Sequence, residues 1–145
     1  MLNRLWPNFV DGTPAIGLLF LRIVAGAALM IHGWDKIQNP FGWMGENAPV
    51  PGVLQALAAL SEFGGGLALI VGFLTPLASL GIMSTMLGAY FVVHKGDPWI
   101  NPGGSSFELA SVYFLIAATL LLTGPGKLSM DALLLHNEKK RHGRY

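Results

Sequence analysis

The stretch VLQALAALSEFGGGLALIVGFL (residues 53–74) decides the fold of this protein. Glu62 is the one charged residue in it, and almost every other residue is apolar or small. About 20 such residues are enough for an α-helix to cross the hydrocarbon core of a bilayer. The stretch also lacks the alternation of apolar and polar residues that is typical of a membrane β-barrel strand. We therefore expect it to span a membrane as a helix.

Three other long apolar runs lie along the chain, and together the four runs predict membrane helices at about 14–34, 53–74, 76–95 and 107–123. The 145 residues are 52% hydrophobic and 12% charged, whereas soluble domains carry about 25% charged residues. A soluble bundle of buried helices is the alternative, but no run has a wide polar face. The predicted fold class is all-α, an integral membrane four-helix bundle that forms a single domain over residues 1–145.

The segments between the runs predict how the chain turns and how it is oriented. The Pro- and Gly-rich stretches 39–52 and 95–106 are expected to be loops, and the turn around Thr75 and Pro76 is short enough for a tight helical hairpin. Ser129 is expected to cap a short amphipathic helix through Leu135 that lies on the membrane surface. The lysines and arginines gather before the first run and after the fourth, in the basic C-terminal tail 137–145. Both termini are therefore predicted to be cytoplasmic in a multi-pass protein of the cell (inner) membrane.

Composition also limits the chemistry. The absence of cysteine excludes disulfides, thiol relays and thiolate-held clusters in the protein itself. A net charge of +1 gives no indication of a nucleic-acid partner. No metal site is predicted.

Ionisable residues within membrane spans are rare and usually face the protein interior. At a rise of about 1.5 Å per residue, Arg22 on the first helix and Glu62 on the second lie within roughly 6 Å of each other in depth. The sequence thus predicts an Arg22–Glu62 ion pair. It leaves open whether that pair is purely structural or forms the floor of a ligand pocket.

Further polar residues cluster toward the outer half of the predicted bundle. His32 and Lys36 are four residues apart and share a helical face, while His94 and Glu108 are expected at a similar depth on the third and fourth helices. Convergent polar groups within apolar walls are typical of a small-molecule site. The hydroxyls of Tyr90 and Tyr113 would add to it. The structural alternatives are that Lys36 snorkels and that Glu108 is a helix-start acid, and we interpret Asp35 and Asp97 as solvated loop residues.

Several segments of the sequence match a known family when they are taken in order. HGWDK (32–36), EFGGGLALIVGFLT (62–75), HKG (94–96) with FELA (107–110), and TGPGKLSMD (123–131) together resemble the DoxX family of small four-helix membrane proteins. The resemblance implies functional positions at Arg22, His32, Lys36, Glu62 and Glu108. It also implies a role in quinone-linked redox processes, such as those of thiosulfate:quinone oxidoreductase subunits, catechol or quinone resistance and oxidative-stress complexes.

The leading hypothesis from the sequence is a quinone-linked oxidoreductase, or a subunit of one, that binds a lipophilic redox molecule in the outer half of the bundle. Its expected catalytic residues are Glu62, His32 and Arg22. The expected substrate-binding residues are Lys36, His94, Glu108, Tyr90 and Tyr113. A redox partner subunit would supply the electrons, because the protein itself offers no redox group.

Three other hypotheses remain open at this point. The chain is an assembly subunit that recruits a partner through its basic C-terminal tail, without catalysis. Alternatively, His32 and His94 ligate a haem, although lysines and a glutamate crowd both histidines. A small transporter is the last alternative, and it would need a homo-oligomer, because four helices are few for alternating access.

Overall fold

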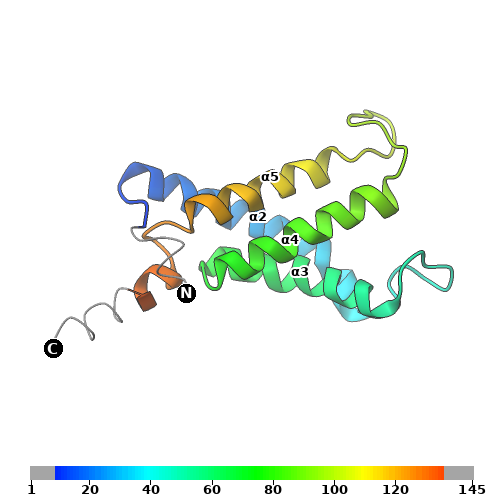
Figure 1. Cartoon of the computed structure of the whole chain (residues 1–145), viewed down its shortest axis with the longest axis horizontal. Helices are drawn as coiled ribbons and strands as arrows, with labels where there is room; N and C mark the ends of the chain where they lie inside the picture. The colour runs from blue at the N-terminus through cyan, green and yellow to red at the C-terminus, as the bar shows by residue number, and fades with distance from the viewer. Residues whose placement is uncertain (1–8, 136–145) are drawn as a thin grey trace.

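The computed structural model describes residues 9–135, and they form a bundle of four helices (Figure 1). The helices are α2 (Thr13–Gln38), α3 (Gly52–Val71), α4 (Thr75–Gly88) and α5 (Glu108–Thr123). A π-helical turn, η1 (Ala89–Val93), continues α4. No strand occurs within residues 9–135, and the predicted all-α bundle is confirmed.

The outer surface of the bundle is that of a membrane protein. Three helical segments are long and apolar enough to cross a bilayer, Thr13–Gln38, Gly52–Val71 and Thr75–Val93. The fourth, α5, is equally apolar but has only 16 residues. Large apolar side chains stay exposed on all sides, among them Phe20 (63%), Ile31 (76%) and Leu122 (80%). Apolar surface on this scale is unfavourable in water and favourable against lipid, so the chain is a membrane protein with three candidate spans.

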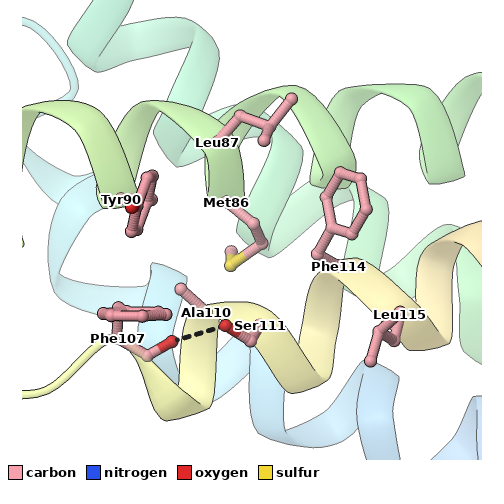
Figure 2. A pocket seen from close by; sticks show the side chains of 8 residues that line it. All are labelled: Met86, Leu87, Tyr90, Phe107, Ala110, Ser111, Phe114 and Leu115. Carbon is pink, nitrogen blue, oxygen red and sulfur yellow. Dashed lines mark hydrogen bonds between the residues drawn. The ribbon is translucent and has the colours of Figure 1, made fainter. Parts of the chain in front are cut away.

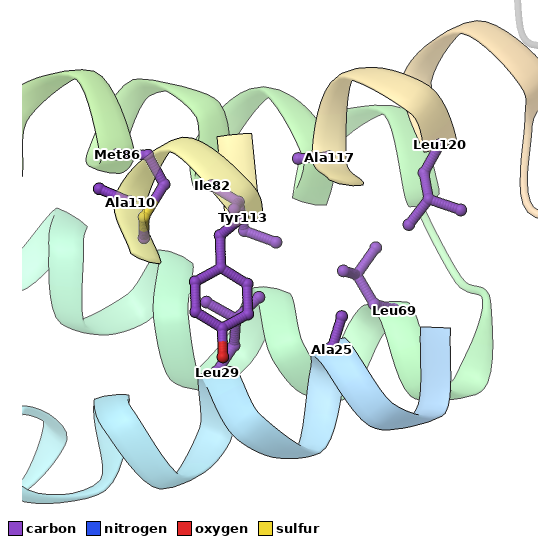
Figure 3. Close-up of a cluster of buried hydrophobic side chains, with 9 residues drawn as sticks. All are labelled: Ala25, Leu29, Leu69, Ile82, Met86, Ala110, Tyr113, Ala117 and Leu120. Atoms are coloured by element: carbon purple, nitrogen blue, oxygen red, sulfur yellow. The ribbon is translucent and has the colours of Figure 1, made fainter. Parts of the chain in front are cut away.

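The core lies where α2, α3, α4 and α5 meet (Figure 3). Its buried members are mostly aliphatic or small: Ala25, Leu29, Leu69, Ile82, Met86, Ala110, Tyr113, Ala117 and Leu120. Small residues let membrane helices approach closely and so increase the dispersion contacts between them. These contacts matter because the hydrophobic effect does not drive helices together within lipid. Tyr113 is the long side chain of the set, and it reaches from α5 across the core toward α2 (Figure 3).

Glycines fix how α2 packs on α3. A Cβ added at Gly26 would lie 2.5 Å from the Gly66 carbonyl oxygen, and one at Gly33 would lie 2.6 Å from the Phe63 nitrogen. No side chain larger than hydrogen fits at either point. The two backbones are therefore in direct contact, and Gly33 lies opposite Phe63 while Gly26 lies opposite Gly66 and Ile70.

The turn between α3 and α4 depends on the C-terminal segment. Helix α3 ends at Gly72, which adopts a left-handed φ of 70°, and Phe73 N donates to Ala68 O at 3.0 Å, as in a Schellman motif. Leu74 also has a positive φ, 48°. The Asp131 carboxylate accepts hydrogen bonds from Leu74 N and Thr75 N, each at 2.9 Å. Asp131 thus caps α4 from 56 residues downstream of Thr75 and holds a backbone conformation that costs about 1–3 kcal/mol elsewhere.

The short C-terminal helix is present, with helical residues at 130–135 (Figure 1). Ala132 N donates to Ser129 Oγ at 3.2 Å, which confirms Ser129 as its cap. Ser129 and Asp131 are buried against the bundle, whereas Met130 and Leu133 are exposed. The placement of this helix on the membrane surface and the cytoplasmic orientation of the termini stay predictions. The basic tail 137–145 lies outside the described residues.

We expect Gly72→Ala to lower the melting temperature of the purified protein in detergent. The substitution forces an L side chain into the left-handed region, at a cost of about 1–3 kcal/mol, and its Cβ would clash with Arg22 Nη1. Gly88→Ala is the matched control, because a Cβ there meets nothing within 4 Å. Equal melting temperatures for the two variants would contradict the packing described for this turn.

Candidate functional site

A cavity of about 560 Å³ opens between α3 and α4 near the end of the bundle that carries the loops 39–51 and 94–107. We call it the Glu62 cavity. Its walls are mostly apolar and include Leu54, Leu57 and Val92, and its charged or titratable members are Lys36, Glu62 and His94. Its volume lies within the range of about 300–1,000 Å³ that small-molecule sites occupy.

Lys36 and Glu62 form an ion pair at the edge of this cavity. Lys36 Nζ lies 2.7 Å from Oε1 and 2.6 Å from Oε2 of Glu62. The Glu62 side chain is 6% exposed and that of Lys36 is 25% exposed. Charge-assisted hydrogen bonds of this kind are stronger than neutral ones. The Lys36 ammonium also lies 4.7 Å from the centre of the Trp43 ring, in a cation–π arrangement.

The packing of α2 on α3 creates this pair. A Cβ at Gly33 would lie 3.0 Å from the Glu62 Cβ, so the glycine makes room for Glu62 beneath α2. Helix α2 extends to Gln38 rather than ending near 34, and Lys36 therefore lies one turn beyond Gly33 on a rigid helix. From there its side chain reaches over Glu62.

The loop 39–51 lines one end of the cavity through Trp43, Met44 and Val50, and Gln55 of α3 holds this loop in place. Gln55 is 3% exposed and accepts a hydrogen bond from Met44 N through Oε1 at 3.0 Å. Its side-chain Nε2 donates to Val50 O at 3.2 Å. Its backbone carbonyl oxygen accepts a hydrogen bond from Trp43 Nε1 at 3.0 Å. Neither Gln55 nor Trp43 was among the site residues predicted from the sequence. An amide within an apolar run was the signal that could have identified Gln55.

The π turn η1 separates two cavities. His94 N donates to Ala89 O at 2.9 Å, and this wider turn places Val92, Val93 and His94 along the Glu62 cavity. Tyr90 instead lines a second cavity of about 320 Å³ between α4 and α5 (Figure 2). There the rings of Tyr90 and Phe107 pack edge to face, with centroids 4.8 Å apart. Single π turns within α-helices often occur at functional sites.

His94 is held by the loop that follows it. Its Nδ1 lies 2.9 Å from Asp97 Oδ2 and 3.2 Å from Ser105 Oγ, and the Ser105 hydroxyl donates to the same Asp97 oxygen. The hydrogen bonds from Ser105 and His94 lower the pKa of Asp97 below its usual value. Asp97 is a partly exposed loop residue, as interpreted from the sequence, with its side chain 27% exposed; the structure adds its hydrogen bonds to His94 and Ser105.

The predicted Arg22–Glu62 pair is also wrong. Arg22 is fully buried, and its Nη2 donates to Leu128 O at 2.5 Å. Gly26 of α2 lies opposite Gly66 and Ile70 of α3. Arg22 comes one helical turn before Gly26 on α2, so it lies beside Gly72, at the end of α3. The Asp131 carboxylate is close enough to act on it electrostatically. The depth estimate assumed that α2 and α3 are centred at the same level, whereas their contacts offset them along their axes.

The other predicted site residues lie apart from the Glu62 cavity. His32 packs edge to face against Tyr113, with ring centroids 6.1 Å apart, and Tyr113 is in the core. Glu108 is exposed in the first turn of α5. Thus the Glu62 cavity brings together Lys36, Glu62 and His94 from the predicted set. Within residues 9–135, no group of three or more His, Asp or Glu side chains is placed to hold a metal ion.

We expect Lys36→Met and Glu62→Gln each to destabilise the protein, and the double variant to recover much of the loss. Removing one partner of a buried pair leaves the other group without compensation, at a cost on the order of 3 kcal/mol. The melting temperatures of the four proteins in detergent form a double-mutant cycle. Lys127→Met is the control, because it removes the exposed Asp11–Lys127 pair. Strictly additive losses would contradict the pairing.

Comparison with known proteins gives a consistent result. The family model described as DoxX matches residues 17–95. The "Inner membrane protein YqjF" of Escherichia coli (strain K12) is 35% identical over 123 residues, which cover 82% of this chain and 92% of that protein. An uncharacterized protein of Haemophilus influenzae is 31% identical over 118 residues, or 79% of this chain and 87% of that protein. The "Putative oxidoreductase CatD" of Bacillus subtilis (strain 168) is 27% identical over 130 residues, or 86% and 91% of the two chains. No solved structure matches.

Proposed function

Because this chain belongs to the DoxX family, we propose that it is a quinone-linked oxidoreductase, or a subunit of one, that binds a lipophilic redox molecule in the Glu62 cavity. One observation carries the proposal: the Lys36–Glu62 ion pair lies at the edge of a mostly apolar cavity inside a membrane protein. Ionisable groups in such a position are costly and are usually retained for function. A relative with an oxidoreductase name supports the same reaction class.

The residues of the cavity suit a quinone. Its apolar walls match a substituted ring, and Leu54, Leu57 and Val93 line it while remaining more than half exposed on the lipid-facing surface. A hydrophobic ligand can therefore enter from the bilayer without crossing water. Lys36 offers a hydrogen-bond donor to a ring oxygen, and Glu62 offers an acceptor.

The chain's own residues perform the binding and the proton steps in this proposal. When bound, the quinone supplies the two-electron chemistry, and a redox partner subunit exchanges the electrons with it. Lys36 orients a ring oxygen and stabilises negative charge on it. Glu62 holds or releases a proton at its carboxylate, and Trp43 with the loop 39–51 keeps water from the outer end. The inner membrane is the proposed location, as the name of the Escherichia coli relative suggests.

We expect gently purified native protein to carry a quinone that Glu62→Gln loses. The substitution keeps the size of the side chain, but it removes the charge that pairs with Lys36 and accepts the proton. The measurement is mass spectrometry of small molecules extracted from both proteins, with their melting temperatures recorded alongside.

Glu108→Gln is the matched control, because Glu108 is exposed and lines neither of the two cavities. It is expected to retain the quinone at the native level. The absence of any bound quinone from the native protein, together with no binding of added quinone, would overturn the proposed function.

A further inference from the structure

The Glu62 cavity contains one further titratable side chain besides the ion pair. His94 lines the cavity, and its Nδ1 lies 2.9 Å from Asp97 Oδ2 and 3.2 Å from Ser105 Oγ. An arrangement in which one ring nitrogen is held by a carboxylate is the usual way in which proteins fix the tautomer of a histidine.

The hydrogen bonds decide which nitrogen of His94 carries the proton. The pKa of Asp97 is lowered, so this carboxylate is ionised throughout the range in which histidine titrates and has no proton to donate. The Ser105 hydroxyl already donates its proton to Asp97. The proton shared between His94 and Asp97 must therefore belong to Nδ1, and in the neutral ring Nε2 is then a hydrogen-bond acceptor.

We propose that Asp97 and Ser105 are positioning residues that hold His94 as a hydrogen-bond acceptor for the ligand of the Glu62 cavity, so that the cavity prefers ligands with a ring hydroxyl to those without one. The inference rests on the proposed function and adds the substrate class: a hydroquinone or a related phenol is bound in preference to its oxidised or O-methylated form. Lys36 supplies a donor in the same cavity, so one ligand can donate to His94 and accept from Lys36.

The same geometry allows one proton transfer. The hydroxyl O–H bond breaks, an Nε2–H bond forms on His94, and the electron pair stays on the ring oxygen. Asp97 stabilises the resulting imidazolium, as a carboxylate does for a histidine base in other sites. The Lys36 ammonium, which lines the same cavity, stabilises the negative charge on the ring oxygen.

The test compares the affinities of purified protein for three probes: decyl-hydroquinone, decyl-quinone and the dimethyl ether of the hydroquinone. The native protein is expected to bind the hydroquinone most tightly. Asp97→Asn offers an amide donor to Nδ1 and converts Nε2 into a donor, so its affinity for the hydroquinone should fall about threefold to tenfold, the range of one hydrogen bond. Its affinity for the quinone should not fall.

The control is Asp35→Asn, which removes an exposed carboxylate of α2 and should leave the three affinities unchanged.

A measurement without ligand separates the inference from the proposed function. Nitrogen NMR of labelled histidine, with His94 assigned by His94→Gln, should show a proton on Nδ1 in the native protein and on Nε2 in Asp97→Asn. The native tautomer with a proton on Nε2 would overturn the inference. Equal hydroquinone affinity in the native protein and His94→Gln would also overturn it, while loss of binding in Glu62→Gln would leave the proposed function standing. A native protein that binds none of the probes would overturn both.

Discussion

The direct backbone contact between α2 and α3 determines which charged side chains of the bundle can meet. Gly26 against Gly66 and Gly33 against Phe63 leave no space for a Cβ, so the two helices fit together in one register. That register places Lys36 over Glu62 and carries Arg22 past the end of α3. A shift of one turn would separate Lys36 from Glu62 and bring Arg22 toward the core. The position of each charge therefore depends on close packing at four backbone positions.

The buried Arg22 and the partly buried Lys36 have different surroundings, and this difference indicates different roles. Arg22 is enclosed at the carboxyl end of α3, where the helix dipole favours a positive charge, and it bonds a backbone oxygen of the C-terminal segment. Asp131 of that segment caps α4. Together they attach the segment to the α3–α4 turn, and neither side chain lines the Glu62 cavity. Lys36 and Glu62, in contrast, border open volume, which is what a ligand requires.

The sequence was sufficient for the fold class, because the length and apolarity of each run depend on the bilayer and not on tertiary detail. It was also sufficient for Ser129, since a cap is a local interaction. The sequence was insufficient to identify the partner of Glu62. That partner depends on how far α2 is offset from α3 along their axes, and this offset is set by glycine contacts between the two helices that neither apolar run encodes alone. The partners of the loop residue Asp97, His94 and Ser105, were not predicted for a related reason: they come together only through the π turn at the end of α4 and the loop that follows it.

The energetics of the Lys36–Glu62 pair favour a role beyond stability. A buried ion pair recovers little more than the cost of its own desolvation, and apolar residues of similar volume commonly stabilise a protein as well or better. Close packing at Gly33 already fixes the register of α2 on α3, so the pair is not needed to specify it. What apolar residues cannot provide at this position is a hydrogen-bond donor and an acceptor beside the Glu62 cavity, which the proposed function requires. In the proposed function the pair therefore serves the ligand, while the glycines beneath it serve the fold.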